Sequence, residues 1–122
     1  MARAINTAAR HEFHLSEDTN KDGSLKDEAT TFLFKIGSYD NVAAALAEIQ
    51  NGTFLGPACK KLLMESLVGW KSFKNVNGDD IDFAKVKAAD RLAMIGFKGL
   101  AEMLLYLVEL NAAEEEEVGN SG

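Results

Sequence analysis

One segment, residues 18–29, carries the carboxylate and amide oxygens that a calcium site needs. Acidic and amide residues fall at the first, third and fifth positions of an EF-hand-like loop, with a glycine at the sixth. The candidate calcium ligands are Asp18, Asn20, Asp22 and Ser24. However, Ala29 stands at the twelfth position, where an EF-hand has a bidentate glutamate, and strand patterns rather than helices flank the loop. The segment therefore predicts a turn-rich connection, with a calcium-binding module as an open alternative.

The other residues capable of chemistry do not form a catalytic motif. His11 and His14 are the only histidines, and no further His or Cys cluster completes a zinc site with them. The sequence contains no glycine-rich phosphate loop and no Gly-x-Ser-x-Gly nucleophile elbow. Cys59 is the only cysteine, which excludes an internal disulfide and indicates a small buried residue in a reducing compartment. We therefore expect a protein that is not an enzyme and has no cofactor.

Length and charge limit the class of protein further. The chain has 122 residues, enough for one compact domain without a disulfide or a metal ion. Thirteen basic and nineteen acidic residues give a formal charge of −6, which disfavours nucleic-acid binding and docking on an anionic membrane. The apolar run Met103–Val108 is far too short to span a bilayer. We expect a soluble protein of the cytoplasm, with no nucleic-acid or membrane partner.

A central segment, residues 69–83, carries the strongest hairpin signal in the chain. An Asn-Gly pair stands between two arms that contain aromatic and branched apolar residues, the arrangement typical of a β-hairpin turn. The residues expected to build this hairpin are Trp70, Phe73, Asn77, Gly78, Ile81 and Phe83. Trp70 and Phe73 anchor the first arm, and Ile81 and Phe83 lie on one face of the second arm.

Apolar periodicity predicts the remaining elements. Alternation at period two predicts two strands, over residues 13–15 and 30–36. Cap residues and helical spacing predict four helices, over residues 38–50, from residue 57, over residues 85–95 and over residues 100–112. Gly96 and Gly99 mark the break between the last two helices. These elements predict an α+β fold with one domain over residues 1–112 and an acidic, disordered tail over residues 113–122.

Four features follow one another along most of the chain. They are a short strand leading into an acidic loop, a Thr-Phe-Leu strand, a Val-Gly-Trp-Lys-x-Phe segment with its Asn-Gly turn, and a helical region before an acidic tail. The first three correspond to residues 13–18, 31–35 and 68–83. In this order of features the chain resembles small tail-morphogenesis proteins of tailed bacteriophages, particularly tail assembly chaperones.

The resemblance implies a non-enzymatic role in the host cytoplasm, where the chain would keep a tape-measure protein or another tail protein soluble during assembly. That role needs an apolar surface that binds helical segments, and the last predicted helix has a wide apolar face. The candidate partner contacts are Leu104, Leu107, Val108 and Leu110. Burial of the same face in the chain's own core fits the pattern equally well. A structural virion component (neck, tail or capsid-associated) and self-association through this helix are the open alternatives.

Overall fold

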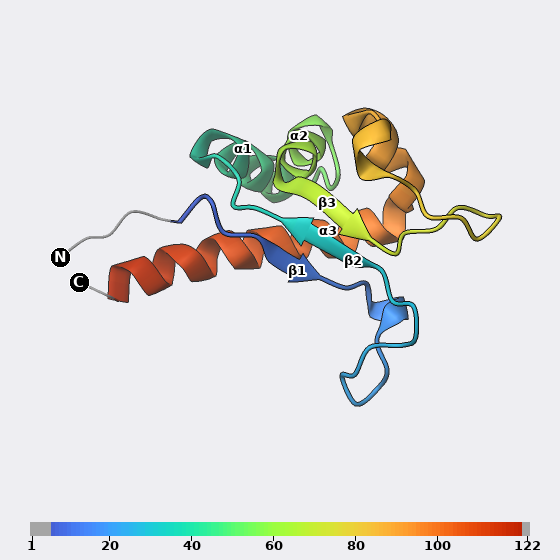
Figure 1. Ribbon diagram of the computed structural model, residues 1–122. Helices are drawn as coiled ribbons and strands as arrows, with labels where there is room; N and C mark the ends of the chain where they lie inside the picture. The colour runs from blue at the N-terminus through green and yellow to red at the C-terminus, as the bar shows by residue number, and fades with distance from the viewer. Residues whose placement is uncertain (1–5, 121–122) are drawn as a thin grey trace.

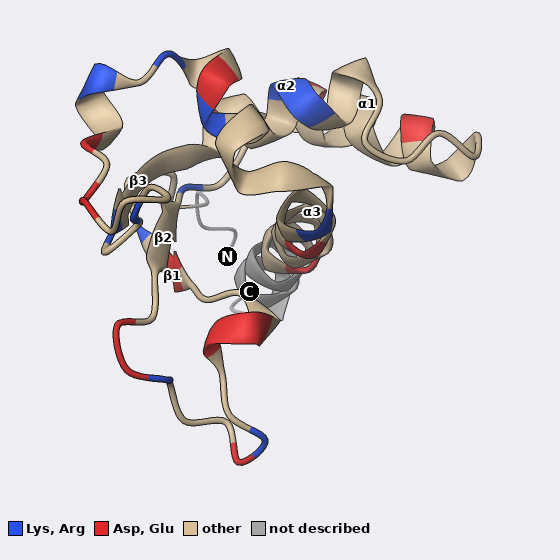
Figure 2. Ribbon diagram, turned by 90° about the vertical axis from the view of Figure 1, so that its right-hand side faces the viewer, with Lys and Arg blue, Asp and Glu red and all other residues tan. Residues whose placement is uncertain are grey.

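The computed structural model describes residues 6–120, with side chains up to residue 112. Within this part the elements are β1 (His11–Phe13), β2 (Thr31–Phe34), α1 (Tyr39–Gln50), α2 (Pro57–Ser66), β3 (Leu67–Lys71) and α3 (Ala88–Asn120). The three strands form one antiparallel sheet in the order β1-β2-β3. The long C-terminal part of α3 crosses one face of this sheet, and α1 and α2 pack side by side (Figures 1 and 2). The predicted α+β class is therefore confirmed.

The core contains buried side chains from the sheet, α1, α2 and α3. Phe32 and Phe34 alternate along β2, so both point to the same face of the sheet, and both are fully buried. Tyr106 of α3 packs against Phe34 with a ring-centroid distance of 5.8 Å and against Phe13 of β1 at 4.7 Å. Each fully buried large apolar side chain contributes about 1.5–3 kcal/mol, so these contacts fix α3 on the sheet.

Local signals at the two central helices are confirmed. Ser38 caps α1, where its hydroxyl accepts a hydrogen bond from the Asn41 amide at 3.4 Å. Pro57 opens α2 at the first turn, where a missing N–H costs nothing. Cys59 is buried as expected, and burial is the main reason why the pKa of its thiol is raised.

The predicted central hairpin is only partly right. Trp70 lies in β3 and pairs with Phe32 of β2, so its strand partner is 38 positions earlier and not across the Asn-Gly turn. The turn itself forms, and the Gly78 amide donates to the Asn75 carbonyl at 3.0 Å. Its arms contain one isolated bridge, Lys74 to Asp80, instead of two strands. β3 is an edge strand whose only partner is β2, and the pairing of strands so far apart in sequence is decided by packing that a local turn signal does not encode.

The predicted hairpin residues nevertheless pack together and reach α3. The Trp70 ring contacts Phe73 at 4.9 Å and Phe83 at 4.8 Å between centroids. The Trp70 indole Nε1–H donates to the Ile81 carbonyl at 2.7 Å. Arg91 of α3 stacks over the Phe83 ring at 3.5 Å and donates to the Phe83 carbonyl at 2.9 Å. This chain of contacts holds the beginning of α3 against the turn segment.

The described residues contain three α-helices rather than four. The predicted break is present as a kink at Gly96, whose φ of 84° and ψ of 167° are not helical, and helix continues on both sides of it within α3. Gly99 lies inside the helical span instead of breaking it. The bounds of α3 reach Asn120, beyond the expected end at Ala112. The side chains beyond residue 112 lie outside the described part of the chain. The disordered tail expected over residues 113–122 therefore stays a prediction.

No helix among residues 6–120 is long and apolar enough to cross a membrane.

Candidate functional site: an apolar groove between α2 and α3

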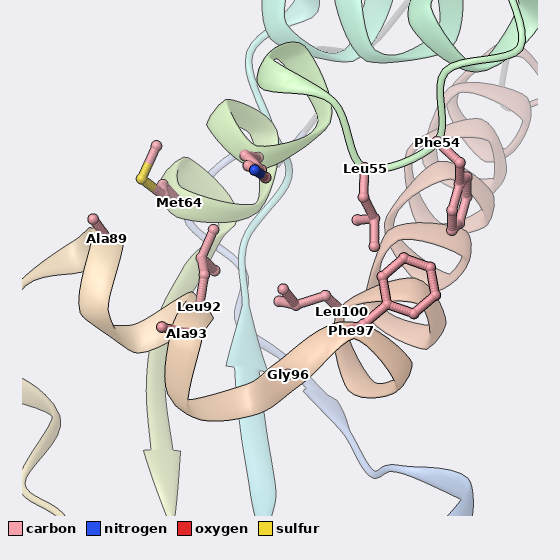
Figure 3. Close-up of a pocket in the computed structure, with 10 residues that line it drawn as sticks. Phe54, Leu55, Met64, Ala89, Leu92, Ala93, Gly96, Phe97 and Leu100 are labelled. Atoms are coloured by element: carbon pink, nitrogen blue, oxygen red, sulfur yellow. The ribbon is translucent and has the colours of Figure 1, made fainter.

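A groove of about 590 Å³ opens between α2, the connection that precedes it and the first part of α3 (Figure 3). The connection and α2 supply Phe54, Leu55, Lys60 and Met64. α3 supplies Ala89, Leu92, Ala93, Gly96, Phe97 and Leu100, which lie on both sides of the kink at Gly96. Lys60 is the one ionisable side chain in this lining, so the groove favours apolar contact.

Large apolar side chains stand exposed around this groove. Among the described residues eight large apolar side chains are exposed, and three of them line it: Phe54 at 39 %, Met64 at 37 % and Phe97 at 71 %. The floor is part of the core, because Leu55, Leu92 and Leu100 are buried. A rim of exposed apolar side chains over an apolar floor is the arrangement that binding surfaces show.

Two unusual backbone conformations shape the groove. Gly96 has a φ of 84°, and an added Cβ would meet nothing within 4 Å, so glycine is favoured here by backbone conformation and not by space. Leu55 has a φ of 60°, which is uncommon for a residue with a branched side chain. Its side chain is buried while that of the preceding Phe54 is exposed. Such strain of about 1–3 kcal/mol gathers at ligand-binding sites, and here it accompanies a backbone path that puts Leu55 in the floor and the preceding Phe54 on the rim.

Glu48 of α1 fixes the connection that carries Phe54. Its carboxylate accepts hydrogen bonds from the Ala58 amide at 2.9 Å and the Cys59 amide at 3.1 Å, at the N-terminus of α2. These free helix donors favour the ionised form, and the Ala58 bond is the main cause that lowers the pKa of Glu48 below its ordinary value of 4.5. One side of the groove is therefore held in place by a charged cap.

This cap predicts a pH-dependent stability. Because the pKa of Glu48 is depressed in the fold, its stabilisation is fully present above 4.5 and is lost as the pH falls through the lower folded value. We expect Glu48→Gln to lower the melting temperature near neutral pH, and this difference to vanish in acid. Thermal melts of both proteins across the acid range test this, with the exposed Glu109→Gln as the control. A difference that persists unchanged in strong acid would contradict it.

The structure places the four predicted partner contacts elsewhere. Leu104 and Leu107 are fully buried in the core, so a partner would meet neither of them on this fold, and the prediction is corrected there. Val108 and Leu110 are half-buried, and Val108 lines a second cavity of about 460 Å³ beside Tyr39 of α1. The alternative of core burial, which the apolar pattern left open, therefore applies to the two central leucines.

The groove residues themselves were missed by the sequence analysis. Phe54 and Phe97 are 43 positions apart, and no local pattern indicates that they share a surface. A usable signal was nevertheless present, because Phe97 is an aromatic residue directly after the helix-breaking Gly96. Few neighbouring elements pack on the first turn of a helix that restarts at such a break. An apolar side chain in that turn can therefore stay exposed.

The calcium-like loop is a hairpin turn whose candidate ligands bond to one another. The Ser24 hydroxyl donates to Asp22 Oδ1 at 2.6 Å, and this bond is the main cause that lowers the pKa of Asp22. The Asn20 side-chain amide donates to Ser24 Oγ at 3.0 Å, and Asp18 Oδ2 accepts from the Thr30 amide at 3.2 Å. Among the described side chains, residues 6–112, no group of three or more His, Cys, Asp and Glu could hold a metal ion.

The same turn geometry occurs twice, 55 residues apart. In one, the Gly23 amide donates to the Asn20 carbonyl, and in the other the Gly78 amide donates to Asn75, both at 3.0 Å. Both glycines have a φ above 80°, which matches a type I turn followed by a left-handed glycine. Asn at the first turn position and Gly at the fourth therefore account for much of the EF-hand-like spacing without a metal.

We expect millimolar calcium to leave the melting temperature unchanged. A ligand that binds only the folded state raises stability in proportion to the logarithm of its concentration over its dissociation constant, so a site would reveal itself in a titration. Differential scanning fluorimetry with calcium, and with EDTA as the reference, measures this. A rise in melting temperature that is lost in Asp22→Asn would restore the calcium module.

In comparisons with known proteins, no family model matches the chain, and neither a curated protein nor a solved structure shows significant similarity to it. The groove therefore has to be interpreted from its own residues and geometry.

Proposed function

We propose that this chain is a non-enzymatic assembly protein that binds an apolar segment of a partner protein in the groove between α2 and α3. The observation that carries the proposal is the gathering of Phe54, Met64 and Phe97, all exposed, on one groove with a buried apolar floor. Exposed aromatic and Met side chains are the residues that protein interfaces favour. Met suits a site that holds varied apolar segments, because its side chain is flexible.

The proposed partner is a bacteriophage tail protein, and the first candidate is the tape-measure protein. This part of the proposal rests on the resemblance to tail assembly chaperones in the order of features along the chain. Such a chaperone needs an apolar site for transient binding, and a net charge of −6 counteracts its own aggregation. The proposed place of action is the host cytoplasm. A permanent component of the virion is the rival, and its groove would be filled in the finished particle.

Mass spectrometry of purified phage particles and an affinity pull-down from the infected lysate test the proposal together. We expect the chain to be absent from particles and the tape-measure protein to co-purify with it. Phe97→Ser should abolish this capture, because truncating a central aromatic anchor typically costs at least about 2 kcal/mol of binding. The control is Val76→Ser, at the fully exposed tip of the turn over residues 75–78, because Val76 does not line the groove.

Three results would overturn parts of the proposal. A fixed copy number of the chain in particles makes it a structural component. Capture that survives Phe97→Ser removes the groove from the function. Failure to retain the tape-measure protein or any other tail protein removes the assembly role.

A further inference from the structure

The charges around the groove have the opposite sign to the chain as a whole. Between the first and last lining residues of each wall, residues 54–64 and 89–100, there are four basic residues and one acidic residue, Asp90. The basic residues are Lys60, Lys61, Arg91 and Lys98. The whole chain carries −6, whereas the two segments that form the groove are basic; Lys60 is in the lining itself, and Lys61 and Lys98 are next to lining residues in the sequence.

Three of these basic side chains are available to a partner. Lys60, Lys61 and Lys98 are exposed, and within the described residues none of them has an ion-pair partner. Arg91 is occupied by its contacts with Phe83. The acidic side chains nearest in sequence to the α2 wall are engaged as well, since Glu48 bonds the start of α2 and Glu65 accepts from the Ser38 amide at 2.7 Å. Both carboxylates keep their charge but are tied to backbone amides, and the two wall segments themselves hold three more basic than acidic residues.

The shape of the groove fits a helix. One wall is formed by α3 and the other by α2 with the connection before it, and the α3 wall contains the small residues Ala89, Ala93 and Gly96, over which another helix can approach closely. The α3 part of the lining runs from Ala89 to Leu100 across the kink at Gly96. An amphipathic helix that lies in such a groove inserts apolar residues spaced by three and four and keeps its polar side chains at the rim.

From these observations we infer that the groove binds an acidic amphipathic helix of a partner protein. Its apolar side chains contact Phe54, Met64 and Phe97, and its carboxylates face Lys60, Lys61 and Lys98. This inference rests on the proposed function and adds the chemical class of the bound segment. Electrostatic complementarity at the rim then adds to specificity and to the rate of association.

A pair of designed peptides tests the charge preference directly. Both are amphipathic, about 14 residues long and capped at both ends, with identical Leu and Phe positions; one has Glu at the flanking positions and the other has Lys. Fluorescence anisotropy with the full chain is measured at about 50 mM and about 500 mM NaCl, where screening differs strongly. We expect the Glu peptide to bind at least about tenfold more tightly at low salt, and this advantage to shrink at high salt.

Charge-reversal variants make the test specific for the groove. Lys60→Glu combined with Lys61→Glu should remove or invert the preference for the Glu peptide. The matched control is Lys21→Glu combined with Lys26→Glu, which changes the net charge equally on the distant Asp18–Ala29 loop, where both lysines are exposed. The control should keep the preference, because charges beyond a Debye length are largely screened.

The outcomes separate this inference from the proposed function. Equal binding of both peptides that is lost in Phe97→Ser overturns the acidic preference and leaves the groove as a binding site. Tighter binding of the Lys peptide overturns the inference as well. Binding of neither peptide overturns the acidic-helix inference, and capture of the tape-measure protein by the original chain and by Phe97→Ser then decides the proposed function. Light scattering could instead show a dimer that dissociates in Phe97→Ser. That result would place a second copy of this chain in the groove and overturn the inference of a helix from a partner protein.

Discussion

Replacing Trp70 with alanine is expected to lower the free energy of unfolding by about 3–5 kcal/mol, as truncation of large aromatic core residues does. Trp70 is buried and contacts two aromatic neighbours, Phe73 and Phe83, in the segment that follows β3. Its indole N–H also bonds the Ile81 carbonyl at 2.7 Å. The truncation therefore removes packing and a hydrogen bond at the junction between the sheet and the turn segment.

Chemical denaturation of the variant measures this loss, and two further variants divide it. Trp70→Phe keeps most of the packing but leaves the Ile81 carbonyl without its donor, a change worth about 1–3 kcal/mol. Val76→Ala, at the exposed tip of the same turn, should stay within about 0.5 kcal/mol of the original chain. A loss below about 1 kcal/mol for Trp70→Ala would show that the side chain is not part of the core.

The second large effect is expected at Leu107, which was a candidate partner contact by sequence although core burial fits the apolar pattern equally well. Because Leu107 is fully buried in the core, Leu107→Ala should cost about 2–5 kcal/mol of stability. Its matched control is Leu105→Ala, two positions earlier on the same helix, where the side chain is 56 % exposed. That change should stay within about 0.5 kcal/mol.

Denaturation curves of the two leucine variants therefore decide between core and surface for this helix. If Leu107→Ala and Leu105→Ala lower the free energy of unfolding by equal and small amounts, Leu107 is again a candidate partner contact. Peptide binding provides an independent readout, because folded Leu107→Ala should keep the affinity of the groove while Phe97→Ser loses it.

Sequence reasoning succeeded where the signal is local. Alternation of Phe32 and Phe34 predicts their shared burial, and Ser38 and Pro57 predict the beginnings of two helices. The Asn-Gly pair predicts a turn, and Gly78 adopts the left-handed conformation that glycine allows. Each of these features depends on neighbours within a few positions, so the backbone conformation follows directly from residue type.

Sequence reasoning failed where the decision is made by contacts across the chain. The strand that contains Trp70 pairs with β2 because that pairing brings the Phe32 side chain against the Trp70 ring, a contact between residues 38 positions apart. The apolar stripe of α3 reads the same whether a sheet or a partner covers it. The groove was missed for the same reason, since its walls come from segments far apart in sequence.

The kink at Gly96 divides α3 into two limbs that belong to different neighbours. The first limb is attached to the turn segment through Arg91 and Phe83, whereas the second limb is packed on the sheet through Tyr106 and Phe34. Because only the dihedral angles of one glycine join the limbs, a change of the angle between them requires little else of the helix to deform. The groove lies across this joint, with Leu92 on one limb and Leu100 on the other. A rigid helix bound in the groove therefore contacts both limbs and fixes the angle between them.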